Sequence, residues 1–209
     1  MNILEKYGEW INQGTSQSIK KAYDIAKKAH QGQTRNIKTK EGEDIEYITH
    51  PLKVAELVKQ LKSSHKISDL IKAAILHDTV QDTDITLDYI KNEFGELVHN
   101  LVKELTNDPE EMKRIGKTQY LTNKMLHMTS WALIIKLADR YSNVEDLFNA
   151  FHGSYKQKVW ANKYAIQTQE IIKELKEKRE LTSTQKNLVE LIENKLNDFF
   201  KGMSEEKIV

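Results

Sequence analysis

Proline and glycine, the residues that most often interrupt helices, are scarce in this chain, which has two prolines and eight glycines in 209 residues. Between them, apolar residues recur at the three- and four-residue spacing of one helix face, as in Ile19, Ala22, Tyr23 and Ala26. The sequence therefore predicts an all-α fold. We expect helices over residues 18–30, 49–61, 68–77, 86–94, 96–105, 109–127, 130–148, 154–178 and 183–201.

The segment between His30 and His50 departs from this helical pattern. Residues 36–40 and 44–48 alternate weakly between polar and apolar side chains, and Gly42 lies between the two runs. Alternation with a period of two is typical of a strand, and a glycine between two such runs favours a turn. We therefore expect a loop or a short β-hairpin near residues 36–48.

The composition argues against several classes of protein. A formal net charge of +1 gives no reason to expect nucleic-acid binding, and no apolar run approaches the ~20 residues of a membrane span. The first eight residues lack the apolar region of a signal peptide. Cysteine is absent, which excludes disulfides and thiolate metal sites and fits a reducing compartment. We expect a cytoplasmic protein without a membrane or nucleic-acid partner, and the sequence does not predict its oligomeric state.

Two histidines and two aspartates stand beside apolar segments. His77 and Asp78 follow the apolar residues 73–76, and His50 and Asp139 lie in similar surroundings. A buried carboxylate is costly unless it is paired or binds a metal. Imidazole and carboxylate ligands without sulfur favour manganese, iron or magnesium over a closed structural zinc site. Such an ion can activate water at neutral pH and hold a phosphate oxygen, so these residues indicate a metal-dependent phosphohydrolase.

Less specific interpretations apply to single residues of these types. Histidines in helical proteins are usually polar residues with ordinary partners, and His65, His99, His127 and His152 are interpreted in that way. For Asp139 the alternative to metal binding is an ion pair with Arg140 or Lys136.

The residues around the four candidate ligands resemble those of a known family. His77-Asp78, with a histidine upstream and an aspartate downstream, resembles the pattern of the HD phosphohydrolase superfamily. Longer segments resemble the hydrolase domain of RelA/SpoT-type alarmone enzymes over about residues 18–175, and the chain length resembles that of stand-alone small alarmone hydrolases. These segments are Ala29-His30-Gln31-Gly32-Gln33-Thr34-Arg35, Tyr47-Ile48-Thr49-His50-Pro51-Leu52-Lys53-Val54-Ala55, Ala73-Ala74-Ile75-Leu76-His77-Asp78-Thr79-Val80-Gln81-Asp82-Thr83, Phe94-Gly95 and Lys136-Leu137-Ala138-Asp139-Arg140-Tyr141-Ser142-Asn143.

The resemblance implies a helical HD hydrolase domain over residues 1–178. The segment 179–209 has no counterpart in the family, and we expect a helical extension that packs on the domain. The resemblance also implies one manganese ion per chain, with iron or magnesium less favoured. The implied reaction removes pyrophosphate from the 3′ position of guanosine tetra- or pentaphosphate, so the implied partner is a small nucleotide. The implied ligands are His50, His77, Asp78 and Asp139.

One residue departs from the family pattern, which has glutamate-aspartate after the histidine-aspartate pair. Here Gln81 occupies the glutamate position, and Asp82 is retained. A carboxylate can accept a proton from the attacking water, whereas an amide can only orient that water by hydrogen bonding. We expect Asp82 to act in catalysis with Gln81 orienting. The alternatives are a slowed enzyme, a non-catalytic nucleotide sensor, or a hydrolase of another phosphorylated nucleotide.

Four further residues are candidates for nucleotide binding. Arg35 resembles the family's basic residue beside the nucleobase, and an arginine can stack on a planar base. Asn143 resembles the asparagine that contacts the sugar, and Tyr164 resembles a tyrosine that could close the pocket. The family's second basic residue is displaced here, with Lys38 as the substitute. Lys113, Arg114 and Lys117 are interpreted as a solvated helix face.

Overall fold

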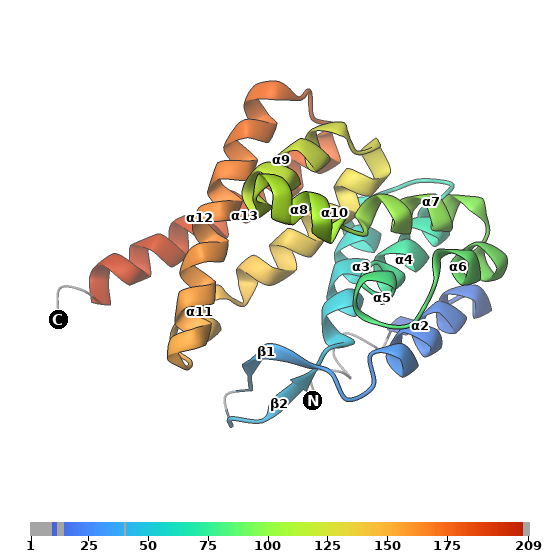
Figure 1. The fold of residues 1–209 in the computed structure, drawn as a ribbon, viewed down its shortest axis with the longest axis horizontal. Coiled ribbons are helices and arrows are strands. Elements are labelled where there is room, and N and C mark those ends of the chain that lie inside the picture. The colour runs from blue at the N-terminus through green and yellow to red at the C-terminus, as the bar shows by residue number, and fades with distance from the viewer. Residues whose placement is uncertain (1–9, 12–14, 40, 207–209) are drawn as a thin grey trace.

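The computed structural model of this protein describes residues 10–11, 15–39 and 41–206, and helices make up most of it (Figure 1). Its one sheet within the described residues is a two-stranded hairpin. The elements are α2 (Gln17–Ala29), β1 (Thr34–Lys38), β2 (Asp44–Glu46), α3 (Thr49–Leu61), α4 (Ile67–Leu76), α5 (Thr79–Asp82), α6 (Leu87–Phe94), α7 (Glu96–Leu105), α8 (Pro109–Ile115), α9 (Lys117–His127), α10 (Ser130–Glu145), α11 (Leu147–Phe151), α12 (Tyr155–Lys178) and α13 (Ser183–Glu206).

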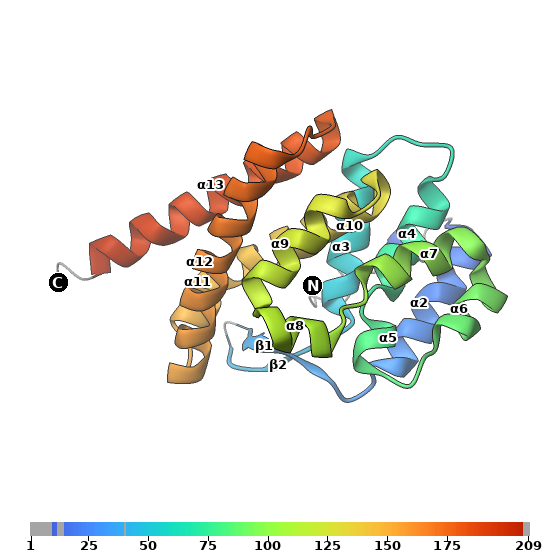
Figure 2. The ribbon, with the colours of Figure 1, turned by 45° about the horizontal axis from the view of Figure 1, so that its top comes forward.

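Helix α10 is the central element of the core. Residues 132–140 are all buried, and α3, α4, α7 and α13 all contact the helix. Figures 1 and 2 show α12 and α13 on one side of α10 and the group of α3, α4 and α7 on the other. A helix enclosed on all sides is expected to be apolar all round, so the charged residues within this stretch require partners in the interior.

The hairpin lies where the sequence predicts one. Thr34 is opposite Glu46 and Lys38 is opposite Asp44, with an irregularity between the two pairs. Gly42 in the turn has a φ of 87°, a conformation that glycine adopts without steric cost.

Side chains from α11 and α12 hold the hairpin against the helices. The amide of Asn149 donates to the backbone oxygen of Lys38 (2.8 Å), and that of Gln157 donates to the backbone oxygen of Asn36 (3.0 Å). These bonds fix β1 beside the C-terminal end of α10, where several candidate site residues lie.

The all-α prediction is confirmed, but two predicted helices are wrong in extent. The helix expected over residues 109–127 is divided into α8 and α9 at Gly116, whose φ of 87° lies outside the helical region. The helix expected over residues 130–148 ends at Glu145, and α11 follows. Asp146, the residue at this break, pairs with Arg35 of β1 (2.8 Å), so a tertiary contact accompanies an interruption that no glycine or proline marks.

In the described part of the chain, no helix has both the length and the apolar character that crossing a bilayer requires. Residues 1–9, for which the sequence predicts no signal peptide, lie outside the described residues.

Helix α13 packs on α10 and extends beyond it (Figure 1). Leu188, Ile192, Leu196 and Phe199 are buried, and the Gln185 amide donates to the Ser130 backbone oxygen at 3.0 Å. The division of the chain into a domain over residues 1–178 and a packed extension over residues 179–209 stays a prediction.

We expect Ile192→Ala to lower the free energy of unfolding of the whole chain. Ile192 is fully buried, and removing a buried isoleucine side chain costs about 2–5 kcal/mol through lost burial and the cavity left behind. Denaturant unfolding followed by tryptophan fluorescence and circular dichroism should show one transition at lower denaturant. The exposed Lys195→Ala is the control and should change stability by less than about 0.5 kcal/mol. An unchanged midpoint for Ile192→Ala would show that α13 does not stabilise the domain.

Candidate functional site

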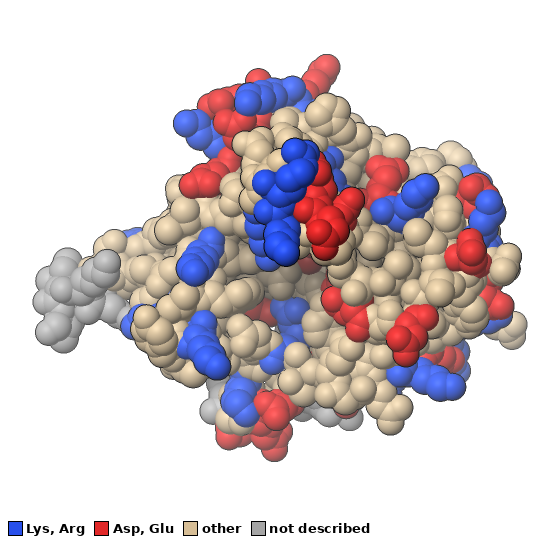
Figure 3. All heavy atoms as spheres, viewed as in Figure 1, with Lys and Arg blue, Asp and Glu red and all other residues tan. Residues whose placement is uncertain are grey.

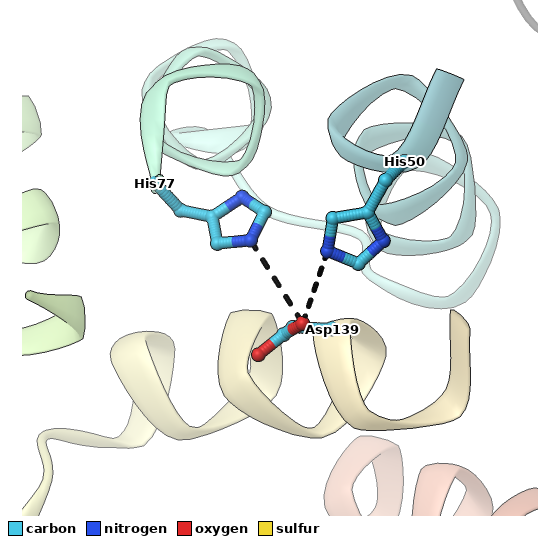
Figure 4. Close-up of side chains that lie close together, drawn as sticks. All are labelled: His50, His77 and Asp139. Carbon is cyan, nitrogen blue, oxygen red and sulfur yellow. Dashed lines mark ion pairs between the residues drawn. The ribbon is translucent and has the colours of Figure 1, made fainter. Parts of the chain in front are cut away.

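Three of the predicted metal ligands meet in the interior (Figure 4). His50 from α3, His77 after α4 and Asp139 from α10 each offer one atom, and these atoms lie within 4.8 Å of one another. Asp139 Oδ1 is 3.1 Å from His50 Nε2 and 3.9 Å from His77 Nε2. All three residues are buried, so the cluster is positioned by the packing of α3, α4 and α10.

The hydrogen bonds of the two imidazoles indicate which nitrogen of each ring is left to bind a metal ion. His77 Nδ1 lies 2.7 Å from the backbone oxygen of Ala74, which can only accept, so Nδ1 carries a proton and Nε2 is the nitrogen that the neutral ring would offer to a cation. His77 Nε2 is buried and has no hydrogen-bond partner among the described residues. His50 Nδ1 contacts the Ser142 hydroxyl at 2.9 Å, which leaves its Nε2 directed at Asp139. Rings held at one nitrogen with the other nitrogen facing a carboxylate fit metal ligation.

Asp78, the fourth predicted ligand, adjoins this cluster. Its Oδ2 lies 3.1 Å from His77 Nε2 and 3.7 Å from His50 Nε2, and it accepts a hydrogen bond from the Tyr47 hydroxyl at 2.5 Å. The structure therefore brings all four predicted residues together, with two carboxylates facing two imidazoles.

The ion-pair alternative for Asp139 is realised at its second oxygen. Oδ2 lies 2.8 Å from the Lys136 ammonium, while Oδ1 faces the histidines. Burial alone would raise the pKa of Asp139, but Lys136 and the two histidines hold that pKa well below its ordinary value. Asp139 is therefore an anion that has one oxygen directed at the cluster.

The two histidines differ in proton affinity when no cation is bound. Burial and the nearby Arg35 lower the pKa of His50 to about 4. Burial opposes protonation of His77 as well, but the carboxylates of Asp78 and Asp139 outweigh it and raise the pKa of His77 to about 9. A divalent cation at this site would therefore compete with a proton on His77.

The predicted catalytic pair lies on the short helix α5. Gln81 Oε1 accepts a hydrogen bond from the backbone N–H of Asn107 at 2.7 Å, which ties α5 to the segment before α8. The carboxyl pKa of Asp82 is raised, first by partial burial and then by the charge of Asp78. Its backbone oxygen accepts from the Gln33 amide at 3.0 Å.

Three of the predicted nucleotide-binding residues form one network beside the cluster. Arg35 Nη2 donates to Asn143 Oδ1 at 2.8 Å, and Asn143 Nδ2 donates to Asp139 Oδ1 at 2.9 Å. Tyr164 is a neighbour of Asn143: burial raises the pKa of Tyr164, and the Asn143 side chain opposes that rise. Lys38 is not brought into this network, because it is exposed and pairs with Asp44 across the hairpin at 2.8 Å.

Two basic residues that the sequence analysis did not assign to the site also lie here. Arg140 is buried, donates to Thr168 Oγ1 at 2.7 Å and has its guanidinium 5.1 Å from the centre of the Tyr164 ring. Lys117 is exposed, as the sequence predicts, but partial desolvation and then the charges of Arg140 and Lys136 lower its pKa. Figure 3 shows a hollow in the middle of this face, with atoms of both basic and acidic residues at its floor.

Comparison with known proteins agrees with this geometry. The family model described as HD domain matches residues 22–178. Human guanosine-3′,5′-bis(diphosphate) 3′-pyrophosphohydrolase MESH1 is 37% identical over 128 residues, which cover 60% of this chain and 67% of the relative. An enzyme of the same activity name from Aquifex aeolicus is 37% identical over 142 residues, covering 64% of this chain and 18% of the relative. The solved structure of a metazoan ortholog of SpoT that hydrolyzes ppGpp superposes with a TM-score of 0.67 at 22% identity. The match covers 87% of this chain and 97% of that one, and it supports the fold.

The contact between Gln81 and Asn107 predicts a local effect of substitution at position 81. Gln81→Leu should expose the Asn107 amide and speed its hydrogen exchange, because a hydrogen bond of this kind contributes about 0.5–1.5 kcal/mol. Gln81→Glu keeps an acceptor oxygen and should preserve the protection. Amide exchange measured by NMR on the three proteins is the test. Equal exchange in the wild type and Gln81→Leu would mean that the contact does not hold the segment before α8.

Proposed function

Because this chain belongs to the HD-domain family, we propose that it is a metal-dependent hydrolase that removes the 3′-pyrophosphate of guanosine tetra- or pentaphosphate. The observation that carries the proposal is the buried cluster of His50, His77 and Asp139, in which the Nε2 atoms of two imidazoles face one carboxylate oxygen. Relatives 37% identical to the chain are named for this activity.

We propose that one divalent cation is held by His50, His77, Asp78 and Asp139, and that the cation is manganese. The donor set supports this, because nitrogen and oxygen ligands without sulfur suit manganese, with iron or magnesium as the less favoured choices. Bound there, the ion would supply a Lewis acid that makes water more acidic and offsets the charge of a phosphate oxygen.

Two residues of α5 would accept the proton of the attacking water and orient that water. Asp82 would accept that proton while the water oxygen bonds to the phosphorus beside the ribose 3′ oxygen. The bond between that phosphorus and the 3′ oxygen breaks, pyrophosphate leaves, and the 3′ oxygen takes up a proton. The raised pKa of Asp82 supports this role, since a base works best when its pKa approaches the working pH. With Oε1 of Gln81 engaged by Asn107, its Nε2 would orient the water.

The nucleotide would lie along the network of Arg35, Asn143 and Tyr164. Arg35 would stack on the base, Asn143 would contact the sugar, and Tyr164 would close the pocket. The hydrogen bonds from Arg35 to Asn143 and from Asn143 to Asp139 support this assignment, because they lie beside the proposed metal centre. Lys117 and Arg140 would offset the charge of the leaving pyrophosphate.

A second candidate function is a nucleotide sensor with slow or no turnover. The observation that favours it is Gln81 at the position of the family glutamate, where an amide cannot accept the proton of a water. A third candidate function is hydrolysis of another phosphorylated nucleotide. Composition alone supports the predictions of a cytoplasmic location and of no nucleic-acid partner.

We expect the purified chain with manganese to release pyrophosphate from guanosine tetraphosphate, and Asp139→Asn to abolish this release. The substitution removes the anion that faces both imidazoles. Product analysis by ³¹P NMR and metal content by elemental analysis give the readouts, and His65→Ala, at an exposed histidine, is the control. A panel of 3′- and 2′-phosphorylated nucleotides distinguishes the candidate substrates. Tight binding without turnover of any of them would replace the hydrolase with the sensor.

Gln81→Glu should raise kcat by at least about tenfold, and Asp82→Asn should abolish the remaining activity. General-base assistance is typically worth about 10²–10⁴ in rate, and Asp82 would already supply part of it. Single-turnover rates at saturating manganese are the measurement. If the chain is already fast and Gln81→Glu changes nothing, no carboxylate is needed at position 81.

A further inference from the structure

His30 is a buried histidine with no role in the mechanism described above. It is 3% exposed, and its Nδ1 lies 2.8 Å from Gln33 Oε1. Gln33 Nε2 donates to the backbone oxygen of Asp82 at 3.0 Å. A carbonyl oxygen only accepts, so this bond fixes which end of the Gln33 amide faces His30. The oxygen end faces the ring, and His30 Nδ1 therefore carries a proton and donates it.

The same imidazole packs on Tyr47. The two ring centres are 4.7 Å apart, and the planes are inclined by 36°. The Tyr47 hydroxyl in turn donates to Asp78 Oδ2 at 2.5 Å. Burial and the charge of Asp78 raise the pKa of Tyr47, so the hydroxyl remains a donor at neutral pH.

These contacts reach both ends of helix α5. Asp78 is the residue that precedes the helix and Asp82 is its last residue. A helix of four residues has too few internal hydrogen bonds to maintain its own orientation. The Tyr47 hydroxyl bonds the Asp78 side chain at the start of α5, and the Gln33 amide bonds the Asp82 backbone at its end. His30 contacts both Tyr47 and Gln33.

We propose that His30, Gln33 and Tyr47 form a clamp that sets the orientation of Asp78 and Asp82 in the active site. The three are positioning residues, since they act through the two aspartates. The proposal rests on the proposed function, which makes Asp78 a metal ligand and Asp82 the proton acceptor.

The arrangement explains why a polar ring lies in this buried place. An apolar ring could pack on Tyr47, but it would leave Gln33 Oε1 without the donor that fixes the amide. His30 Nε2 has no hydrogen-bond partner among the described residues, so the side chain is held there by its Nδ1–Gln33 contact. The imidazole therefore combines a flat packing surface with one donor at a fixed position.

Each contact of the clamp predicts a different effect. Tyr47→Phe removes one hydroxyl and should weaken manganese affinity by about 10–100-fold, the usual effect of losing a partner of a metal ligand. Gln33→Leu removes the bond to Asp82 and should lower kcat at saturating manganese by about 10-fold or more, with KM nearly unchanged. His30→Phe keeps a ring on Tyr47 but loses the donor to Gln33, so it should resemble Gln33→Leu. His30→Asn keeps a donor but loses the ring, so it should resemble Tyr47→Phe.

The experiment measures manganese affinity by calorimetry, kcat and KM with guanosine tetraphosphate, and metal-free melting temperature for the full chain and each variant. Matched controls are Tyr155→Phe, Gln60→Leu and His65→Phe, which alter exposed residues of the same types. The expected result is the split between metal affinity and kcat, with the controls unchanged. Gln33→Glu, which keeps an acceptor for His30 but has no donor for Asp82, replaces Gln33→Leu if that variant does not fold.

Three outcomes overturn the clamp. If the wild type binds manganese and turns over, and Tyr47→Phe and Gln33→Leu match it, the clamp alone is wrong. If all variants lose affinity and kcat in proportion to their loss of melting temperature, the three residues act through stability only. If the wild type neither binds manganese nor hydrolyses the nucleotide, the proposed function fails and the clamp fails with it.

Discussion

The buried carboxylate of Asp139 is the group around which the fold and the candidate site are organised together. It stands on the central helix, in a stretch where all residues from 132 to 140 are buried. An uncompensated charge there would cost several kcal/mol, so both of its oxygens need partners. Lys136, on the same helix, pairs with one oxygen of Asp139. His50 of α3 and His77, which follows α4, face the other oxygen. The helices that form the core are therefore the helices that assemble the site, and neither can be rearranged without the other.

The helical class could be predicted because periodicity and the scarcity of helix-interrupting residues agree along the chain. The extents of two helices could not. Gly116 lies inside a continuous helical pattern, and only its backbone conformation shows that the chain changes direction there. No glycine or proline in the sequence marks the break at Asp146. The break coincides with the ion pair to Arg35, which lies 111 positions away in the sequence. The short helix α5 was also not expected, since four residues are too few to show a period.

The candidate ligands could be predicted because imidazoles and carboxylates beside apolar residues are chemically unusual and because their spacing resembles a known family. Their surroundings could not be predicted in the same way. The pKa of the exposed Lys117 is lowered first by partial desolvation and then by the charges of Arg140 and Lys136, and the residues around Lys117 in the sequence do not indicate these neighbours. The protonated nitrogen of His30 likewise follows from a bond between Gln33 and the backbone of Asp82. Such properties arise from contacts between distant segments, and sequence patterns do not encode them locally.

The way in which β1 is held has a consequence for how this protein behaves at high concentration. A two-stranded sheet has two free edges, and an exposed edge can act as a template on which another chain adds a strand. Here the backbone oxygens of Asn36 and Lys38 are already bonded by the amides of Gln157 and Asn149. A foreign strand would have to displace both side chains and separate β1 from α11 and α12 before it could pair. The same amides that attach the hairpin to the helices therefore protect its β1 edge against the addition of a foreign strand.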